Sequence, residues 1–365
     1  MRIVQIINSL EIGGAETLAR SLHRRYLLRG HDCLLIALAG HRRGWLETGV
    51  YCLGLESPYN PQALIQILDL PCDQDPSSAD CVHVHLFPSQ FYAAVARKVS
   101  RFGKAMITTE HSTANRRRNN LLGRKLDGWF YSSFDAVTTV SDAVGRRLSE
   151  WVPSVSEKVR VVHNGIDLNR FSPSEASEKP KGVLTIVSVG RLTQAKNYFR
   201  VLEAVSNVRK RTELELSYLI AGSGNLAEKL RKYSAELGLN DTVEFLGEIE
   251  DVSALLQSAD IFLMPSIREG FGLAAAEAMA SGLPVVASRL QGISEVVGTD
   301  GKCGILIDPE SVDEISDALL KLIRDRPLAE RLGAKGVRRA ERFNISRTVD
   351  MYLELYEEMI RNKQG

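Results

Sequence analysis

The sequence lacks a strong net charge, a long apolar run and a recognisable metal-binding pattern. Its 46 lysines and arginines offset 45 acidic residues, and the resulting net charge of +1 excludes a polyanion binder that works by bulk charge. No window approaches the roughly 18 consecutive apolar residues of a membrane-spanning helix. The five cysteines are odd in number and fit no zinc spacing, which favours a reduced, cytoplasmic compartment.

The two halves of the sequence differ slightly in net charge. Residues 1–175 contain 21 Lys and Arg against 17 Asp and Glu, which leaves 25 and 28 for the remainder. The first half is therefore +4 and the second −3, so an anionic partner is expected to meet the first half. The first residues, Met1–Asn8, are mostly apolar, but Glu11 and Glu16 follow closely. This apolar segment is too short for a signal peptide and predicts a buried strand.

Short apolar runs alternate with amphipathic stretches along the whole chain. Strands are predicted at Ile3–Ile7, Leu34–Leu38, Cys81–His85, Ala105–Thr109, Ala136–Val140, Val159–Val162, Leu184–Val189, Leu216–Ala221, Val243–Leu246, Ile261–Met264, Val285–Ala287 and Gly304–Ile307. Helices are predicted between them, for example at about 15–28 and 197–208. Such alternation indicates parallel sheets covered on both faces. The fold class is therefore α/β, with two doubly wound Rossmann-like domains facing a cleft.

The domain boundary is predicted from a polar stretch with two prolines, residues 171–182. The expected organisation is a first domain at 1–170, this linker, and a second domain at 183–347. A C-terminal helix at about 348–365 is expected to pack back on the first domain.

The segment Arg268–Met279 follows the predicted strand Ile261–Met264 and carries the strongest functional signal. Gly270 and Gly272 let the backbone approach a ligand, and the small residues after them open a helix whose amides face the same ligand. Glu269 and Glu277 suit the hydroxyls of a ribose and a hexose. The alternative is that Glu269 caps the helix and Glu277 is a solvated surface residue.

Three further segments follow predicted strands. Gly190 gives a tight turn, and Arg191 with Lys196 suits a diphosphate, although a basic surface loop has the same composition. Gly13 and Gly14 open a helix without forming the GxGxxG fingerprint, so a plain strand-to-helix turn is the alternative. His111 stands at the end of a strand, where a catalytic role competes with a structural one.

Together these segments resemble the retaining glycosyltransferases of family 4, which have the B-type two-domain fold. The resemblance covers nearly the whole chain. It is carried by Gly-Gly-Ala-Glu at 13–16, His-Asn-Gly-Ile-Asp at 163–167, Val-Gly-Arg-Leu at 189–192, Lys196-Asn197, Ala-Gly-Ser-Gly at 221–224, Ala-Asp-Ile-Phe-Leu-Met-Pro-Ser at 259–266, Glu269 and Glu-Ala-Met-Ala-Ser-Gly-Leu-Pro at 277–284. Gln291-Gly292 departs from the commoner Gly-Gly pair.

The resemblance implies a role for each matching residue. Arg191 and Lys196 would bind the donor diphosphate, Glu277 the ribose, and His111 would sit over the reacting sugar. Glu269, with the backbone of Gly270, Phe271, Gly272 and Leu273, would hold the transferred sugar. Gly14 would approach the phosphate or the acceptor, and Gly190 would belong to the donor-binding site.

The expected activity is retaining transfer of a hexose or N-acetylhexosamine from a UDP- or GDP-sugar to a glycan or lipid-linked acceptor, in cell-surface polysaccharide or glycolipid synthesis. No Asp-x-Asp stands near the predicted diphosphate site, so no metal and no cofactor are expected. The alternatives are an epimerase or glycosyl phosphorylase of the same fold, or a non-catalytic nucleotide-sugar binder. A dinucleotide oxidoreductase is disfavoured because the first turn has no GxGxxG.

Residues 97–125 hold nine basic residues and one acid, Glu110. With the nearby Leu121, Leu122, Leu126, Trp129 and Phe130, they predict a surface for an anionic membrane, on which Arg116–Arg118 would help to dock the protein. The alternative is a solvated charged face whose apolar neighbours pack inside. Nucleic acid is not expected, because the basic run lacks stacking aromatics. The expected location is the cytoplasm, in solution or against the inner face of the membrane.

Overall fold

The computed structural model describes residues 1–11, 13–71, 74–100, 102–113, 118, 120–174 and 182–363. Its contacts divide the chain into two compact units, residues 1–165 with 345–365, and residues 166–344. Residues 166–174 belong to the second unit because Phe171 is buried and Arg170 pairs with Asp251 there. Of the predicted linker, 175–181 lies outside the described residues.

The first unit is built on an eight-stranded sheet in the order β3-β4-β2-β1-β5-β6-β7-β8. Its strands are β1 (Arg2–Ile7), β2 (Asp32–Ala39), β3 (Arg43–Glu47), β4 (Val50–Leu55), β5 (Cys81–His85), β6 (Ala105–Glu110), β7 (Ala136–Thr139) and β8 (Val159–Val161). All pairs are parallel except β3 with β4. This antiparallel edge hairpin is absent from the sequence prediction.

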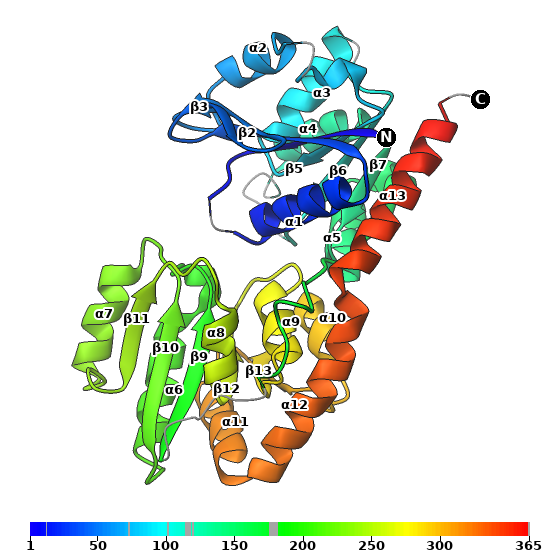
Figure 1. Ribbon diagram of the computed structural model, residues 1–365. Coiled ribbons are helices and arrows are strands. Elements are labelled where there is room, and N and C mark those ends of the chain that lie inside the picture. The colour runs from blue at the N-terminus through cyan, green and yellow to red at the C-terminus, as the bar shows by residue number, and fades with distance from the viewer. Residues whose placement is uncertain are drawn as a thin grey trace. The chain divides into compact units, whose positions relative to one another are not determined.

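Alternating side chains of these strands face two layers of helices. Val4 and Ile6 pack with α2 (Gln62–Leu68), α3 (Ser89–Val99), α4 (Leu121–Ser132) and α5 (Asp142–Trp151). Ile3, which precedes Val4 and faces the opposite way, packs with α1 (Gly14–Leu28) and α13 (Ile345–Arg361). Figure 1 shows α13 (red) beside the strands and α1 of this unit. The C-terminal helix is thus part of the first unit's core.

The second unit has a six-stranded, fully parallel sheet in the order β11-β10-β9-β12-β13-β14. Its strands are β9 (Val183–Val189), β10 (Glu215–Ala221), β11 (Val243–Gly247), β12 (Ile261–Met264), β13 (Val285–Ser288) and β14 (Ile305–Ile307). Its helices are α6 (Tyr198–Arg209), α7 (Ala227–Glu236), α8 (Ser253–Ser258), α9 (Leu273–Ala280), α10 (Gln291–Val297), α11 (Val312–Arg324) and α12 (Arg326–Ala340).

The core of the second unit follows from the same alternation. Ile186 and Leu263 pack with α6 and α11, while Val187 and Phe262, facing the other way, are also fully buried. The predicted pair of doubly wound α/β units is therefore confirmed. Within the described residues, no helix is both long and apolar enough to cross a membrane.

Candidate active site

The second unit contains a topological switch point between β9 and β12. The chain winds outward from β9 through β10 to β11 on one side, and through β12 and β13 to β14 on the other. Loops that leave the carboxyl ends of two such strands diverge, and ligands of open α/β sheets bind in the space between them. Gly190–Lys196 form the loop after β9, and the predicted segment Arg268–Met279 begins in the loop after β12 and continues into α9.

Backbone contacts hold the loop after β9 against its neighbours. The amide of Gly190 donates to the carbonyl of Ala221 at 2.9 Å, and that of Leu192 donates to Ser223 at 2.7 Å. A side chain at Gly222, where φ is +143°, would place its Cβ 2.1 Å from the Gly190 carbonyl oxygen. Glycine at 222 is thus required for this close approach.

Lys196 and Glu269 join the two loops by an ion pair. Lys196 Nζ lies 2.6 Å from Glu269 Oε2, and the two side chains are 20% and 21% exposed. The amide of Ile267 also donates to the carbonyl of Ala195 at 2.9 Å. An ion pair at this depth presents a cation and a carboxylate side by side, which suits a ligand with a phosphate next to a polyhydroxyl group.

Helix α9 begins at this site without a side-chain cap. Its N-cap, Gly272, has φ of +97°, a conformation that favours glycine, and the first amides of the helix remain for a ligand. Phe271 is buried against Phe343, with ring centroids 5.3 Å apart, so only its backbone can contribute to binding. A Cβ at Gly292 would lie 2.3 Å from the Gly270 carbonyl oxygen, so the glycine of the Gln291-Gly292 pair is needed for packing.

Glu277 stands one turn into α9 and is not fully solvated. Burial raises the pKa of its carboxyl group to about 7, with Arg170 acting to lower it and Asp251 to raise it. Arg170 Nη2 lies 3.0 Å from Asp251 Oδ1. The sequence predictions did not include Arg170 and Asp251, because no motif contains either residue.

Arg191 differs from Lys196 in its surroundings. Its side chain is exposed, and no ion-pair partner for it occurs among the described residues. The two cations predicted for a diphosphate therefore occupy one loop, one of them paired and the other open to solvent.

In the first unit the switch point lies between β1 and β5. The loops after these strands are tied by Asn8, whose Nδ2 donates to the Phe87 carbonyl at 2.8 Å and whose Oδ1 accepts from the Ser89 hydroxyl at 2.8 Å. Gly13 is the uncapped N-cap of α1, and exposed Gly14 begins the helix. A Cβ at Gly13 would lie 2.3 Å from Glu16 Oε2, so the Glu16 carboxylate lies over this turn.

His111 follows β6 and is half-buried against His85 of β5. His85 Nδ1 lies 3.4 Å from His111 Nε2, and burial lowers the pKa of His111 to about 4. The preceding residue, Glu110, anchors this loop: its Oε2 accepts from Arg118 at 2.9 Å and from the Tyr131 hydroxyl at 2.5 Å. His111 is therefore a neutral group at physiological pH.

Part of the predicted membrane surface is buried in the structure, so that part of the prediction is wrong. The Arg118 side chain is only 7% exposed, because it pairs with Glu110, and Arg97 pairs with Asp135 at 2.9 Å. Phe130 is fully buried. Arg118 and Phe130 are therefore too buried to contact a bilayer, and most of the Arg97 side chain is buried in its ion pair. Arg101, Arg116 and Arg117 lie outside the described residues.

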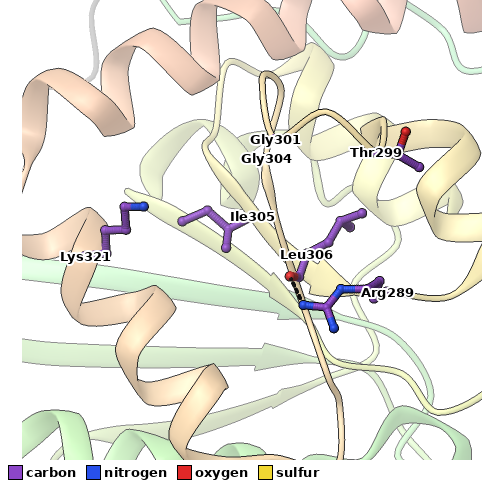
Figure 2. Close-up of a pocket in the computed structure, with 7 residues that line it drawn as sticks. All are labelled: Arg289, Thr299, Gly301, Gly304, Ile305, Leu306 and Lys321. Carbon is purple, nitrogen blue, oxygen red and sulfur yellow. Dashed lines mark hydrogen bonds between the residues drawn. The ribbon is translucent and has the colours of Figure 1, made fainter.

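The second unit also has an open cavity of about 370 Å³ away from these loops. Figure 2 shows its lining, in which Arg289 donates to the Leu306 carbonyl oxygen at 3.1 Å. Arg289 also pairs with Glu314 at 3.3 Å. None of the predicted site residues lines this cavity, so the chemistry is better placed at the switch point, where charged groups converge.

Two family models match consecutive parts of the chain. Residues 12–170 match Glycosyltransferase Family 4, and residues 170–339 match Glycosyl transferases group 1. The chain belongs to these glycosyltransferases. The resemblance inferred from the motifs is confirmed.

Curated relatives point to the same class. An MMP alpha-(1->4)-mannosyltransferase of Mycolicibacterium hassiacum is 36% identical over 207 residues, which cover 56% of this chain and 49% of the relative. The match thus spans about half the length of that relative. A D-inositol 3-phosphate glycosyltransferase of Corynebacterium jeikeium is 29% identical over 314 residues, covering 79% of this chain and 74% of that one.

Solved structures share the fold at low sequence identity. The Anabaena protein HepE in complex with UDP-glucose superposes with a TM-score of 0.81 at 20% identity, over 98% of this chain and all of that one. A glycosyltransferase from Rickettsia africae gives a TM-score of 0.80 at 18% identity, over 99% of both chains. The likeness confirms the two-unit B-type fold.

The raised pKa of Glu277 predicts that nucleotide-sugar affinity depends on pH. If its carboxylate accepts hydrogen bonds from ribose hydroxyls, binding favours the ionised form. Nucleotide-sugar affinity should therefore fall about tenfold for each pH unit below 7, because the proton must be released on binding. Above pH 7 the affinity should level off. Calorimetry with a nucleotide sugar, which has no terminal phosphate to titrate, measures this dependence.

The Glu277→Gln variant is the control for this titration. Its affinity should be weaker and independent of pH in the same range, whereas a Glu310→Gln variant at an exposed position should behave as wild type. A wild-type affinity that does not change between about pH 6 and 8 would remove Glu277 from the binding site.

Proposed function

We propose that this chain is a retaining, metal-independent glycosyltransferase that moves a hexose or N-acetylhexosamine from a UDP- or GDP-sugar to a glycan or lipid-linked acceptor. The observation that carries the proposal is the Lys196–Glu269 ion pair at the β9/β12 switch point, beside the uncapped start of α9. Glu277, one turn further along α9, extends the same site towards a ribose.

The charge pattern matches what cleavage of a glycosyl phosphate requires. As the bond from the sugar to the diphosphate breaks, negative charge collects on the diphosphate and positive charge on the sugar. Lys196 and Arg191, with the first amides of α9, stabilise the leaving diphosphate. Binding of the diphosphate would draw Lys196 from Glu269 and leave that carboxylate to accept hydrogen bonds from the sugar hydroxyls.

In the first unit, the family resemblance assigns His111 to the reacting sugar. Neutral His111 can exchange hydrogen bonds with a sugar hydroxyl without adding a positive charge next to the developing sugar cation. A cationic imidazole there would oppose the reaction. Retention of the anomeric configuration is proposed from the family resemblance, with attack from the face that the diphosphate leaves.

Metal independence is proposed because the protein already supplies positive charge at the leaving group. A divalent ion in such enzymes neutralises the diphosphate. Lys196 and Arg191 occupy the loop beside the same position, so the chemistry has a substitute for the ion.

Relatives support the choice of donor and acceptor class. Structural neighbours were solved with UDP and with UDP-glucose. An Escherichia coli relative, 31% identical over 218 residues, is a UDP-Gal:alpha-D-GlcNAc-diphosphoundecaprenol alpha-1,3-galactosyltransferase. A lipid-linked acceptor for this chain, in polysaccharide or glycolipid synthesis, agrees with a protein that works against the cytoplasmic face of a membrane.

The first unit has a surface suited to such an acceptor. We define the α3–α4 patch as the exposed residues Lys98, Val99, Leu121, Leu122, Arg124, Lys125 and Trp129. Leu121 and Leu122 are 75% and 78% exposed, and Lys98 Nζ lies 5.0 Å from the centre of the Trp129 ring. Basic and apolar side chains together favour the interface of an anionic bilayer.

The activity is tested directly with a panel of nucleotide sugars. The purified chain, given UDP- or GDP-sugars with a lipid-linked glycan acceptor, should release the nucleoside diphosphate and form an α-linked product from an α-linked donor. Saturating EDTA should leave the rate unchanged. Loss of turnover in EDTA, restored by magnesium or manganese, would contradict metal independence; an inverted product would contradict retention.

The leaving-group cations are tested by substitution. Lys196→Ala and Arg191→Ala should each lower kcat/KM by about 100-fold, because a preorganised charge partner of the diphosphate is lost. Lys302→Ala, at an exposed position of the same unit, is the matched control and should retain wild-type turnover. Wild-type kinetics in both site variants would refute their assignment.

Membrane binding is tested by sedimentation with liposomes that contain anionic lipid. Wild-type protein should sediment at low salt and less at high salt. The triple variant Lys98→Ala, Arg124→Ala and Lys125→Ala should bind roughly 100-fold more weakly, because each basic residue contributes about 1 kcal/mol. Replacing the exposed Arg331, Lys335 and Arg338 of α12 by alanine is the control. Wild-type protein that stays in the supernatant would point to a soluble acceptor.

A further inference from the structure

A row of buried polar side chains lies behind His111 on the α1/α13 face of the first unit's sheet. Gln5 of β1, His83 and His85 of β5, and Thr109 of β6 are all fully buried. Polar groups at such depth are retained only when their hydrogen bonds are satisfied. The partners of each atom therefore determine where the protons lie.

The orientation of the Gln5 amide determines which nitrogen of His85 carries a proton. Its Nε2 donates to the carbonyl of Ala19 in α1 at 3.3 Å, which leaves Oε1 facing His85 Nε2 at 3.2 Å. The flipped amide would set two oxygens against each other at Ala19. Because Oε1 only accepts hydrogen bonds, His85 Nε2 carries a proton.

The second nitrogen of His85 then has a defined role. Burial, with His83 and His111 nearby, holds the pKa of His85 well below its ordinary value, so the ring is neutral and its Nδ1 carries a lone pair. That Nδ1 lies 3.4 Å from His111 Nε2. The His111 nitrogen is therefore the donor of this hydrogen bond.

The other titratable groups near His111 do not reverse this assignment. His83 lies against His85 with ring centroids 4.1 Å apart and ring planes tilted by 40°, and burial lowers its pKa to about 3, so it is neutral as well. Glu110, which would favour a charged His111, is already paired with Arg118. Burial outweighs the carboxylate, and the pKa of His111 stays low, at about 4.

We propose that Gln5 and His85 are positioning residues that fix His111 as the Nε2–H tautomer, so that its Nδ1 lone pair is available to accept a hydrogen bond from a sugar hydroxyl of the substrate. This inference rests on the proposed glycosyl transfer for the identity of that hydroxyl, but the tautomer itself depends only on the first unit. His85 orients the ring, and Gln5 orients His85.

Nuclear magnetic resonance observes the tautomer without any turnover. In the full chain with ¹⁵N-labelled histidine rings, two-bond ¹H–¹⁵N spectra distinguish Nε2–H, Nδ1–H and charged imidazoles; a His111→Asn variant assigns the His111 signals. His111 should be the neutral Nε2–H form from pH 8 down to near its pKa of about 4. An Nδ1–H ring, or a ring charged at pH 6, would overturn the proposal.

Substitutions at His85 link the tautomer to the rate. His85→Phe keeps a ring but leaves His111 Nε2–H without its acceptor, and should lower kcat about 10- to 100-fold with little change in the donor KM, as loss of an oriented catalytic group does. His85→Asn can place Oδ1 near the position of the lost Nδ1. It should keep the Nε2–H tautomer and recover most of kcat.

His83→Phe controls for the loss of a buried imidazole from the same strand. His83 bonds to the Tyr356 hydroxyl and to Thr109, both at 2.6 Å, so its removal should lower the Tm as much as His85→Phe does. It should leave the His111 tautomer unchanged. Equal losses of kcat in the two Phe variants, with the tautomer retained in both, would reduce His85 to a structural residue.

The resonance spectra and the turnover measurements test this inference and the proposed function separately. If no nucleotide sugar is turned over but the spectra show the Nε2–H ring, the activity is wrong and the hydrogen-bond assignment stands. If turnover occurs and the ring is Nδ1–H, the activity stands and the role of Gln5 and His85 is refuted.

Discussion

The ion pair between Lys196 and Glu269 depends on the parallel order of β9 and β12. Neighbouring parallel strands release their loops at the same edge, and at a switch point those loops diverge and leave room for a ligand. The pair then holds a cation and an anion side by side in that space, with only 20% and 21% of their side chains exposed. In the proposed function a nucleotide sugar would satisfy both at once, because its diphosphate would replace Glu269 at the lysine and its hydroxyls would replace the lysine at the glutamate. Donor binding would then exchange internal contacts that are costly to leave unmade.

Two features position the candidate site residues: close backbone packing in the second unit and buried polar side chains in the first. Gly222 and Gly292 are required because a Cβ at either position would collide with the carbonyl of a site loop. In the first unit, Glu110 and its partners Arg118 and Tyr131 anchor the loop of His111, while His85 lies behind the imidazole. In both units, buried neighbours therefore hold the candidate site residues in place. This packing keeps their side chains oriented before a substrate binds.

Much of this was predictable from local patterns. The strands Cys81–His85 and Ile261–Met264 were predicted with the observed bounds, since runs of buried apolar residues specify parallel strands. The hairpin of β3 and β4 was missed because the exposed residues of β3 show no clear apolar period. The family motifs located the loops at the switch point. They could not show that Arg118 is buried in an ion pair, or that Gln5 reaches His85, because 80 residues separate those two in the chain.

If the β9/β12 switch point binds the donor by exchange of the Lys196–Glu269 pair, a crystal structure of the chain with an unhydrolysed nucleotide sugar should show that exchange. The diphosphate should lie beside Lys196 and the first amides of α9, the ribose should lie on Glu277, and Glu269 should turn from the lysine to the sugar. Nucleotide bound elsewhere, or bound at this point with the Lys196–Glu269 pair intact and Glu277 without contact, would contradict this mode of binding.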